Sequence, residues 1–196
     1  MTVATFLTDF ADQAVILPLA AVVAIALWWA GWRRGALAWG FGIGLSLGTL
    51  GALKLLAVVC DGLPLMTGVH SPSGHTASAA AAFGALAAMM LQRCSRTCTA
   101  LLATLAGLLI GATRIAVGAH VPGEVTAGMM VGVAGATLTV WLAGPRPADL
   151  PRRTVALGVL AVLVSAHGQH LKAESRLKAA GGWIRDHFEL SRDDGR

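Results

Sequence analysis

Residues 99–117, TALLATLAGLLIGATRIAV, decide the fold class of this chain, because one charged residue, Arg114, interrupts nineteen otherwise uncharged and mostly apolar positions. Such a stretch is close to the ~20 residues that a helix needs to cross the hydrocarbon core of a bilayer. Comparable stretches occupy about 14–32, 36–59, 75–91, 123–143 and 154–170. The sequence therefore predicts an all-α, polytopic membrane helix bundle with about six transmembrane helices.

The composition agrees with this class. Apolar residues make up 56% of the 196 residues and charged residues only 13%, which excludes a soluble globule and a disordered chain. The net charge of +5 in so apolar a chain reflects loop orientation and not nucleic-acid binding. Three cysteines are too few for a disulfide framework, and no ligand spacing suggests a metal site or another cofactor.

We expect two parts along the chain. Residues 1–170 would form a membrane-embedded domain that begins with an interfacial helix at 1–13. Residues 171–196 would form an amphipathic or flexible tail, in which Leu177, Ile184 and Phe188 share one face that can lie on a membrane surface. Nothing in the sequence indicates the oligomeric state.

Arginine distribution predicts the orientation. Seven arginines fall in the segments on one side of the predicted bundle, whereas the opposite loops, about 60–74 and 118–122, contain no Lys or Arg. The positive-inside rule places the arginine-rich side in the cytoplasm. We therefore expect a multi-pass protein of the cell inner membrane whose other side faces the periplasm or the exterior. The arginines are Arg33, Arg34, Arg93, Arg96, Arg146, Arg152 and Arg153.

Tryptophans and glycines refine the bundle. An aromatic belt is predicted near the arginine-rich side, with Trp28, Trp29, Trp32, Trp39 and Trp141 as its members. Glycines four residues apart predict faces where helix backbones approach closely. These faces carry Gly40, Gly44 and Gly48 in one stretch, Gly107 and Gly111 in another, and Gly128 and Gly132 in a third.

A few ionisable residues lie in or at the ends of the predicted spans, where such residues are expensive and usually functional. They are Lys54, His75, Arg114, His120 and Glu124. In the predicted topology all of them lie near the outer side, so we expect one polar site at that membrane interface. Two other interpretations stay open: the lysine could extend to the interface, and the arginine could form a structural ion pair with the glutamate.

The segment before the third stretch predicts an anion site. Ser73 is a good N-cap residue and Gly74 allows a ligand to approach the backbone. The positive end of the following helix would face an anion. These parts suit phosphoryl transfer: Lys54, Arg114 and this turn would hold the phosphate, His120 would attack it, Glu124 would orient the nucleophile, and His75 would protonate the leaving group.

These residues also form two recognisable motifs. Pro72-Ser73-Gly74-His75, followed by Arg114-x5-His120-x3-Glu124, resembles the second and third signature motifs of the type-2 phosphatidic acid phosphatases, which share a superfamily with the vanadium haloperoxidases. Lys54 resembles the lysine that opens the first motif. The resemblance implies a metal-independent lipid phosphatase that works through a phosphohistidine. Its catalytic residues would be His120, His75 and Glu124, and Lys54, Ser73, Gly74 and Arg114 would bind phosphate.

The chain departs from this pattern at three places. Asp61-Gly62 stand where the first motif usually has Arg-Pro, Glu124 stands in place of Asp, and Thr113 in place of Ser. The missing arginine removes one phosphate ligand. We hypothesise that His70, just before the Ser71-Pro72 turn, partly replaces it by binding phosphate; the alternative is that His70 only faces water.

Two functions of different class therefore remain. One is hydrolysis of a phosphomonoester or diphosphate of a lipid, with phosphatidate, phosphatidylglycerol phosphate, polyprenyl diphosphate and lipid A phosphate all open as substrates. The other is a non-catalytic membrane protein on the same scaffold that binds or moves an anionic lipid. The expected partners are a lipid phosphate and membrane lipids, with no nucleic acid.

Overall fold

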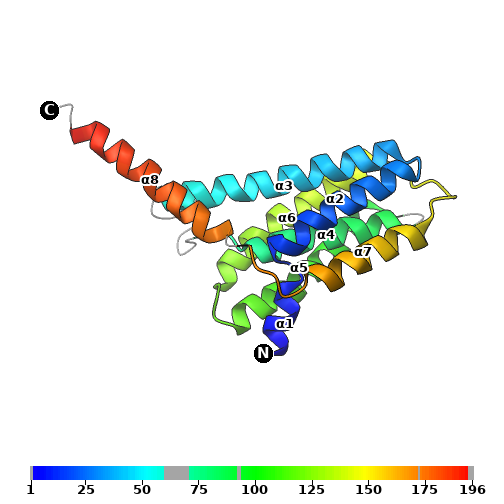
Figure 1. Ribbon diagram of the computed structural model, residues 1–196, viewed down its shortest axis with the longest axis horizontal. Coiled ribbons are helices and arrows are strands. Elements are labelled where there is room, and N and C mark those ends of the chain that lie inside the picture. The colour runs from blue at the N-terminus through cyan, green and yellow to red at the C-terminus, as the bar shows by residue number, and fades with distance from the viewer. Residues whose placement is uncertain (1, 60–70, 92–93, 172, 194–196) are drawn as a thin grey trace.

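The computed structural model describes residues 2–59, 71–91, 94–171 and 173–193, and within these ranges the regular structure is entirely helical (Figure 1). The bundle is all-α, as predicted. The helices are α1 (Val3–Asp9), α2 (Gln13–Trp29), α3 (Arg33–Val59), α4 (Gly74–Met90), α5 (Arg96–Ala116), α6 (Pro122–Ala143), α7 (Arg152–Ala166) and α8 (Ala173–Asp193).

The six predicted stretches coincide with α2 to α7, but only part of the predicted span count is confirmed. Four segments of the described chain are long and apolar enough to cross a membrane: Val3–Trp29, which joins α1 and α2, and the helices α3, α5 and α6. The other two, α4 with 17 residues and α7 with 15, are shorter. The expected number of about six is therefore supported for four segments by length and composition.

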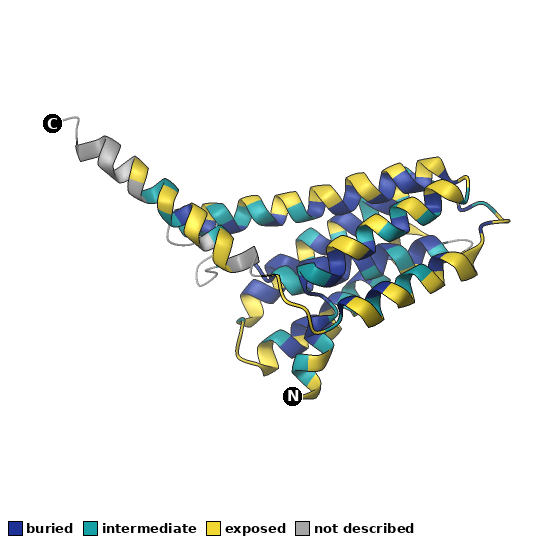
Figure 2. Ribbon diagram, viewed as in Figure 1, coloured by how far each residue is buried: buried dark blue, intermediate teal, exposed yellow. Residues whose placement is uncertain are grey.

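Helix α4 lies inside the bundle and packs against α5 and α6 (Figure 2). Seven alanines line its buried surface, and they are Ala77, Ala79, Ala80, Ala81, Ala82, Ala85 and Ala88. Small side chains let neighbouring backbones approach: a Cβ on Gly132 of α6 would lie 2.6 Å from the Cβ of Ala80. The predicted packing faces of α5 and α6 are thus confirmed, since glycines there contact other helices directly.

The predicted glycine face of α3 is wrong. A Cβ on Gly40, Gly44 or Gly48 would meet nothing within 4 Å. The close approach occurs instead at Gly42, where a Cβ would collide with Thr139 of α6. The four-residue spacing was correct as a periodicity, but it marks the surface of α3 that faces away from the bundle.

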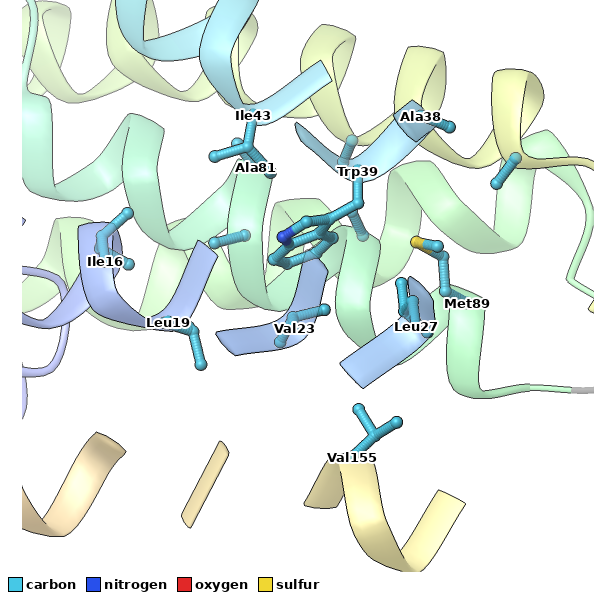
Figure 3. Packing of buried hydrophobic residues seen from close by; sticks show 14 of the residues in the cluster. Ile16, Leu19, Val23, Leu27, Ala38, Trp39, Ile43, Ala81, Met89 and Val155 are labelled. Atoms are coloured by element: carbon cyan, nitrogen blue, oxygen red, sulfur yellow. The ribbon is translucent and has the colours of Figure 1, made fainter. Parts of the chain in front are cut away.

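Two members of the predicted aromatic belt, Trp39 and Trp32, are core residues instead. Trp39 is completely buried among α2, α3 and α4 (Figure 3), and its indole Nε1 donates a hydrogen bond to the carbonyl oxygen of Ala20 at 2.9 Å. Trp32 is also buried, whereas Trp28, Trp29 and Trp141 are exposed as a belt requires. A buried indole needs an acceptor, and the backbone of α2 supplies one here.

The outer surface of the bundle is apolar. On α5 the side chains of Leu101, Leu105, Leu108 and Leu109 are all more than half exposed. Large exposed apolar surfaces of this kind are rare on soluble monomers. Together with several helices of membrane length, they indicate an integral membrane protein.

The tail predicted over 171–196 contains a long helix, α8, which leaves the bundle next to the end of α3 (Figure 1). Gly181 allows the contact, since a Cβ there would lie 2.6 Å from Cγ1 of Val58. The division at residue 170 and the interfacial roles of residues 1–13 and of the tail stay predictions.

Candidate active site

The N-terminus of α4 has the cap that the sequence predicted. Ser73 precedes the helix in an extended conformation, and its Oγ accepts hydrogen bonds from the Thr76 backbone N–H at 3.4 Å and the Thr76 hydroxyl at 2.9 Å. The side chain of Ser73 is fully buried. It therefore stabilises the turn that presents Gly74, and its own contact with phosphate remains a prediction.

The predicted nucleophile and the carboxylate expected to orient it are in contact. His120 Nδ1 lies 2.7 Å from Glu124 Oε2, and both side chains are nearly buried. This hydrogen bond leaves Nε2 as the ring nitrogen that can attack phosphorus. The predicted pairing of His120 with Glu124 across one helical turn is thus observed.

Glu124 also joins the two motifs to each other. Its Oε1 accepts a hydrogen bond from the Ser71 backbone N–H at 3.0 Å, and its carbonyl oxygen accepts one from the Ser73 N–H at 2.9 Å. The start of α6 therefore holds the turn before α4 at two points. These contacts fix where the α4 N-terminus lies relative to His120.

Lys54 reaches the same turn from α3. It is 7% exposed, its Nζ donates a hydrogen bond to Ser71 Oγ at 3.3 Å, and its Cε would be 3.5 Å from a Cβ on Gly74. The ammonium group thus lies beside the positive end of α4, where like charges repel unless an anion lies between them. This placement supports the predicted phosphate-binding role.

Arg114 lies in the last turn of α5, half-buried. One turn earlier, a Cβ on Gly111 would lie 3.5 Å from Thr76 Oγ1 and still closer to Val125 Cγ1. The end of α5 is therefore next to the first turns of α4 and α6. The arginine lies on the side of the bundle that carries the rest of the site, as expected.

His75 contacts a carboxylate that the sequence analysis did not assign. Asp12 Oδ2 lies 3.7 Å from His75 Nε2 and 3.5 Å from His170 Nδ1, while Oδ1 accepts hydrogen bonds from Ala14 N at 2.8 Å and Leu171 N at 3.1 Å. Asp12 thus connects α2, α4 and the segment before α8. The sequence could have indicated Asp12 as a helix N-cap, because it comes directly before a long apolar stretch. It could not have indicated that Asp12 lies beside His75 and His170.

A cavity of about 570 Å³ opens beside these residues. Lys54, Gly74 and His75 line its polar end together with Asp12, while leucines from α2, α3 and α8 form an apolar wall. Arg176 of α8 also lines it, and this second cation was missed because it lies 101 positions after His75. A pocket with a charged end and an apolar wall matches an amphiphile with an anionic head group.

Two predictions lie outside the described residues. His70, the proposed replacement for the missing arginine, and Asp61, at the position of that arginine, both belong to 60–70. Their roles stay predictions.

Comparison with known families decides the assignment, since the model of the PAP2 superfamily matches residues 56–148. These residues are a PAP2 superfamily domain. Comparison with curated proteins gave no match, and comparison with solved structures gave none either. The PAP2 match contains His75, Arg114, His120 and Glu124, and it begins two residues after Lys54.

Membership of the PAP2 superfamily suggests a phosphatase that acts on a phosphate ester. The resemblance inferred from the motifs is therefore confirmed. Outside the matched PAP2 range, the chain adds four polar residues to the cavity beside the motif residues, namely Asp12 at the N-cap of α2, Gln13 of α2, Lys54 of α3 and Arg176 of α8.

Proposed function

We propose that the protein hydrolyses a phosphomonoester or diphosphate of a membrane lipid through a phosphohistidine. The observation that carries the proposal is the 2.7 Å contact between His120 Nδ1 and Glu124 Oε2, next to a cavity that joins Lys54 and His75 to an apolar wall. The superfamily supports the phosphatase class, and the cavity supports a lipid substrate.

In the first step His120 Nε2 attacks phosphorus and forms a P–N bond while the P–O bond to the lipid breaks. Glu124 stabilises the positive charge that develops on the ring. His75 gives its proton to the leaving oxygen, which belongs to the lipid alcohol of a phosphomonoester or to the lipid phosphate that a diphosphate leaves behind. Lys54, Arg114 and the N–H groups at the start of α4 balance the charge on the phosphoryl oxygens.

In the second step a water molecule attacks the phosphohistidine. His75, now neutral, removes a proton from this water as the P–N bond breaks, which releases inorganic phosphate and restores both histidines. No metal ion enters this sequence of steps, because the cationic side chains and the N-terminus of α4 stabilise the negative charge on the phosphoryl oxygens.

The lipid would approach from the membrane side of the cavity. Its apolar wall includes Leu17, Leu47 and Leu177 from three helices, so the start of an acyl or prenyl chain has apolar neighbours when the phosphate reaches His75. We place this end of the bundle at the outer face of the inner membrane, because the opposite end carries the arginine-rich segments. In this proposal α4 and α7 also cross the membrane, for about six spans.

The test is phosphate release by the purified protein from a panel of lipid phosphates and diphosphates, in excess chelator, beside His120→Asn. His187→Asn is the matched control, since His187 lies on α8 and stacks on Trp183 with 4.1 Å between ring centroids. We expect His120→Asn to lose about 10³-fold or more in kcat, as loss of a nucleophile does, and His187→Asn to retain full activity.

Two outcomes would reject the proposal. Equal phosphate release by the parent and His120→Asn would show that the phosphate comes from another source. Lipid binding with no release from any substrate would favour the alternative, a non-catalytic protein that binds or moves an anionic lipid.

A further inference from the structure

A second polar site lies at the other end of the bundle, centred on Arg146. This residue follows α6, is 7% exposed, and has three buried guanidinium nitrogens, Nε, Nη1 and Nη2, with no hydrogen-bond partner among the residues that the structure describes. A buried charge without a partner is strongly unfavourable. The buried guanidinium of Arg146 therefore requires a group that accepts its hydrogen bonds and balances its positive charge.

Two other arginines at this end, Arg34 and Arg96, have partners. Arg34 Nε donates a hydrogen bond to the carbonyl oxygen of Leu142 at 2.7 Å, and the guanidinium of Arg96 lies 5.9 Å from the ring centroid of Trp141. Arg146 is distinguished from them by burial and by its unsatisfied nitrogens. An excess of arginine on the cytoplasmic side explains the others but does not require one to be buried.

Arg146 lines a cavity of about 680 Å³ between the ends of α4 and α6 and the start of α5. Ser95 and Arg96, at the N-terminus of α5, line it too, as do the thiols Cys94 and Cys98. Its described lining residues include no aspartate or glutamate. α4, with 17 residues, separates this cavity from His75 by roughly 25 Å at 1.5 Å per residue.

The lining defines the ligand chemistry. The first N–H groups of a helix have no intrahelical acceptor, and Arg96 begins the 21-residue helix α5 after a Ser95 cap. A guanidinium forms two parallel hydrogen bonds to a phosphate or carboxylate. Two guanidinium groups and a helix N-terminus around one cavity favour a phosphate group, which offers oxygen atoms to all three.

We infer that this cavity binds a phosphate group through Arg146, at a site distinct from the candidate active site. The phosphate can belong to the head group of an inner-leaflet phospholipid or to free inorganic phosphate, and Met89 and Val140 supply apolar neighbours for the first of these. The inference stands whether or not the protein is a phosphatase, because it depends on none of the catalytic residues.

The experiment uses Cys94 and Cys98 as reporters, since both line the cavity and both are partly buried. In a full-length Cys60→Ser protein they are the remaining thiols of the three in the sequence. Their alkylation by a neutral maleimide is measured in detergent with increasing inorganic phosphate. It is measured again in nanodiscs of phosphatidylglycerol and of phosphatidylcholine.

The parent should be protected from alkylation by inorganic phosphate, by phosphatidylglycerol, or by both. Protection in phosphatidylglycerol alone identifies a lipid head group, and protection by inorganic phosphate identifies a free anion. Arg146→Gln should raise the phosphate concentration that gives half-maximal protection by about tenfold or more, or reduce the protection by phosphatidylglycerol by the same factor. This is the scale of one charge-assisted hydrogen bond. Arg153→Gln, which removes an exposed arginine of α7, should leave protection unchanged.

The inference is overturned if neither probe protects the parent, or if Arg146→Gln is protected as well as the parent. Any phosphate bound at the active site affects both proteins equally and cancels in this comparison. If Arg146→Gln does not fold, Arg146→Lys keeps the charge but loses the planar fork. Its midpoint should then rise about tenfold, and an unchanged midpoint would also overturn the inference.

Discussion

At the scale of single residues, the site is organised by two carboxylates, one beside each histidine. Glu124 contacts His120 Nδ1 directly, whereas Asp12 lies 3.7 Å from His75 Nε2. In the proposed mechanism the shorter contact orients the nucleophile. The longer one places a negative charge where it stabilises the imidazolium that a general acid must carry. In the proposed mechanism Asp12 is therefore a positioning residue that acts through His75.

Asp12→Asn should lower kcat about tenfold, because removing a carboxylate behind a catalytic histidine weakens proton transfer. If Asp12 acts through His75, the same substitution in a His75→Asn background should cost nothing more, since residues that act as a unit are not additive. The measurement is kcat for the parent, the two single variants and the double variant.

Asp9→Asn is the control for this cycle, since Asp9 lies near His170, with 4.0 Å between Oδ1 and Nε2, and not at His75. It should retain most of the activity. Additive losses in the Asp12→Asn, His75→Asn double variant would contradict the positioning role and leave a structural one.

At the scale of helices, small residues decide which faces meet. A Cβ on Gly128 of α6 would collide with the Ser73 carbonyl and lie 3.2 Å from the Ser73 N, whereas a Cβ on Gly40 of α3 meets nothing. The glycine on α6 thus allows the turn before α4 to sit against this helix. Packing and site geometry are coupled at this contact.

Gly128→Ala should destabilise the protein by about 1–3 kcal/mol, the usual cost of overpacking. It should also reduce activity, because the Ser73 turn must move. Gly40→Ala should leave both quantities unchanged or slightly raise stability, since alanine favours the helix. Thermal unfolding in detergent and phosphate release measure the two effects, and equal stability of the two variants would contradict the packing described here.

Helix α8 contributes a second cation to the cavity. Arg176 lines the cavity with Lys54 and His75. Gly181 allows α8 to approach the end of α3 closely. In the proposed function Arg176 contacts the substrate head group outside the reacting phosphoryl group. It would thereby supply part of the positive charge that the absent first-motif arginine would have provided.

Arg176→Gln should raise KM about tenfold and change kcat less than about twofold, the pattern of an interaction made equally with the substrate and the transition state. Arg185→Gln removes the same charge from the same helix at a residue that is not among those lining the cavity, and it should change neither constant. A fall in kcat at constant KM for Arg176→Gln would instead indicate a role in the chemical step.

At the scale of the whole molecule, the two ends of the bundle have different chemistry. His75, His120 and Lys54 lie at one end. The other end has Arg96, Arg146, Cys94 and Cys98. The positive-inside rule then predicts which end faces the cytoplasm.

In a protein otherwise free of cysteine, Cys98 should resist an impermeant maleimide added to intact cells and react after the cells are opened. Ala119→Cys, in the exposed loop before His120, should react in intact cells. Labelling of Cys98 alone in intact cells would invert the topology and place the catalytic end in the cytoplasm.

The sequence by itself determined the helical class and the motif residues. Apolar stretches of membrane length leave the backbone no other way to satisfy its hydrogen bonds in lipid, so the predicted and observed helix ends differ by four residues at most, at 170 against Ala166. The His120–Glu124 pair could be predicted because residues four apart share a helix face. Both the helices and this pair depend on residues close together in the chain, so the sequence is enough to predict them.

Only the tertiary structure decided which helix faces meet. Periodicity identified the glycines of α3 at 40, 44 and 48 but not the side they face, because a lipid-facing and a buried small residue look alike in a chain this apolar. The same holds for Trp39, which is in the core, and for Asp12 and Arg176, which reach the cavity from distant segments. Contacts between residues far apart in the chain depend on how all the helices pack, and no local pattern records them.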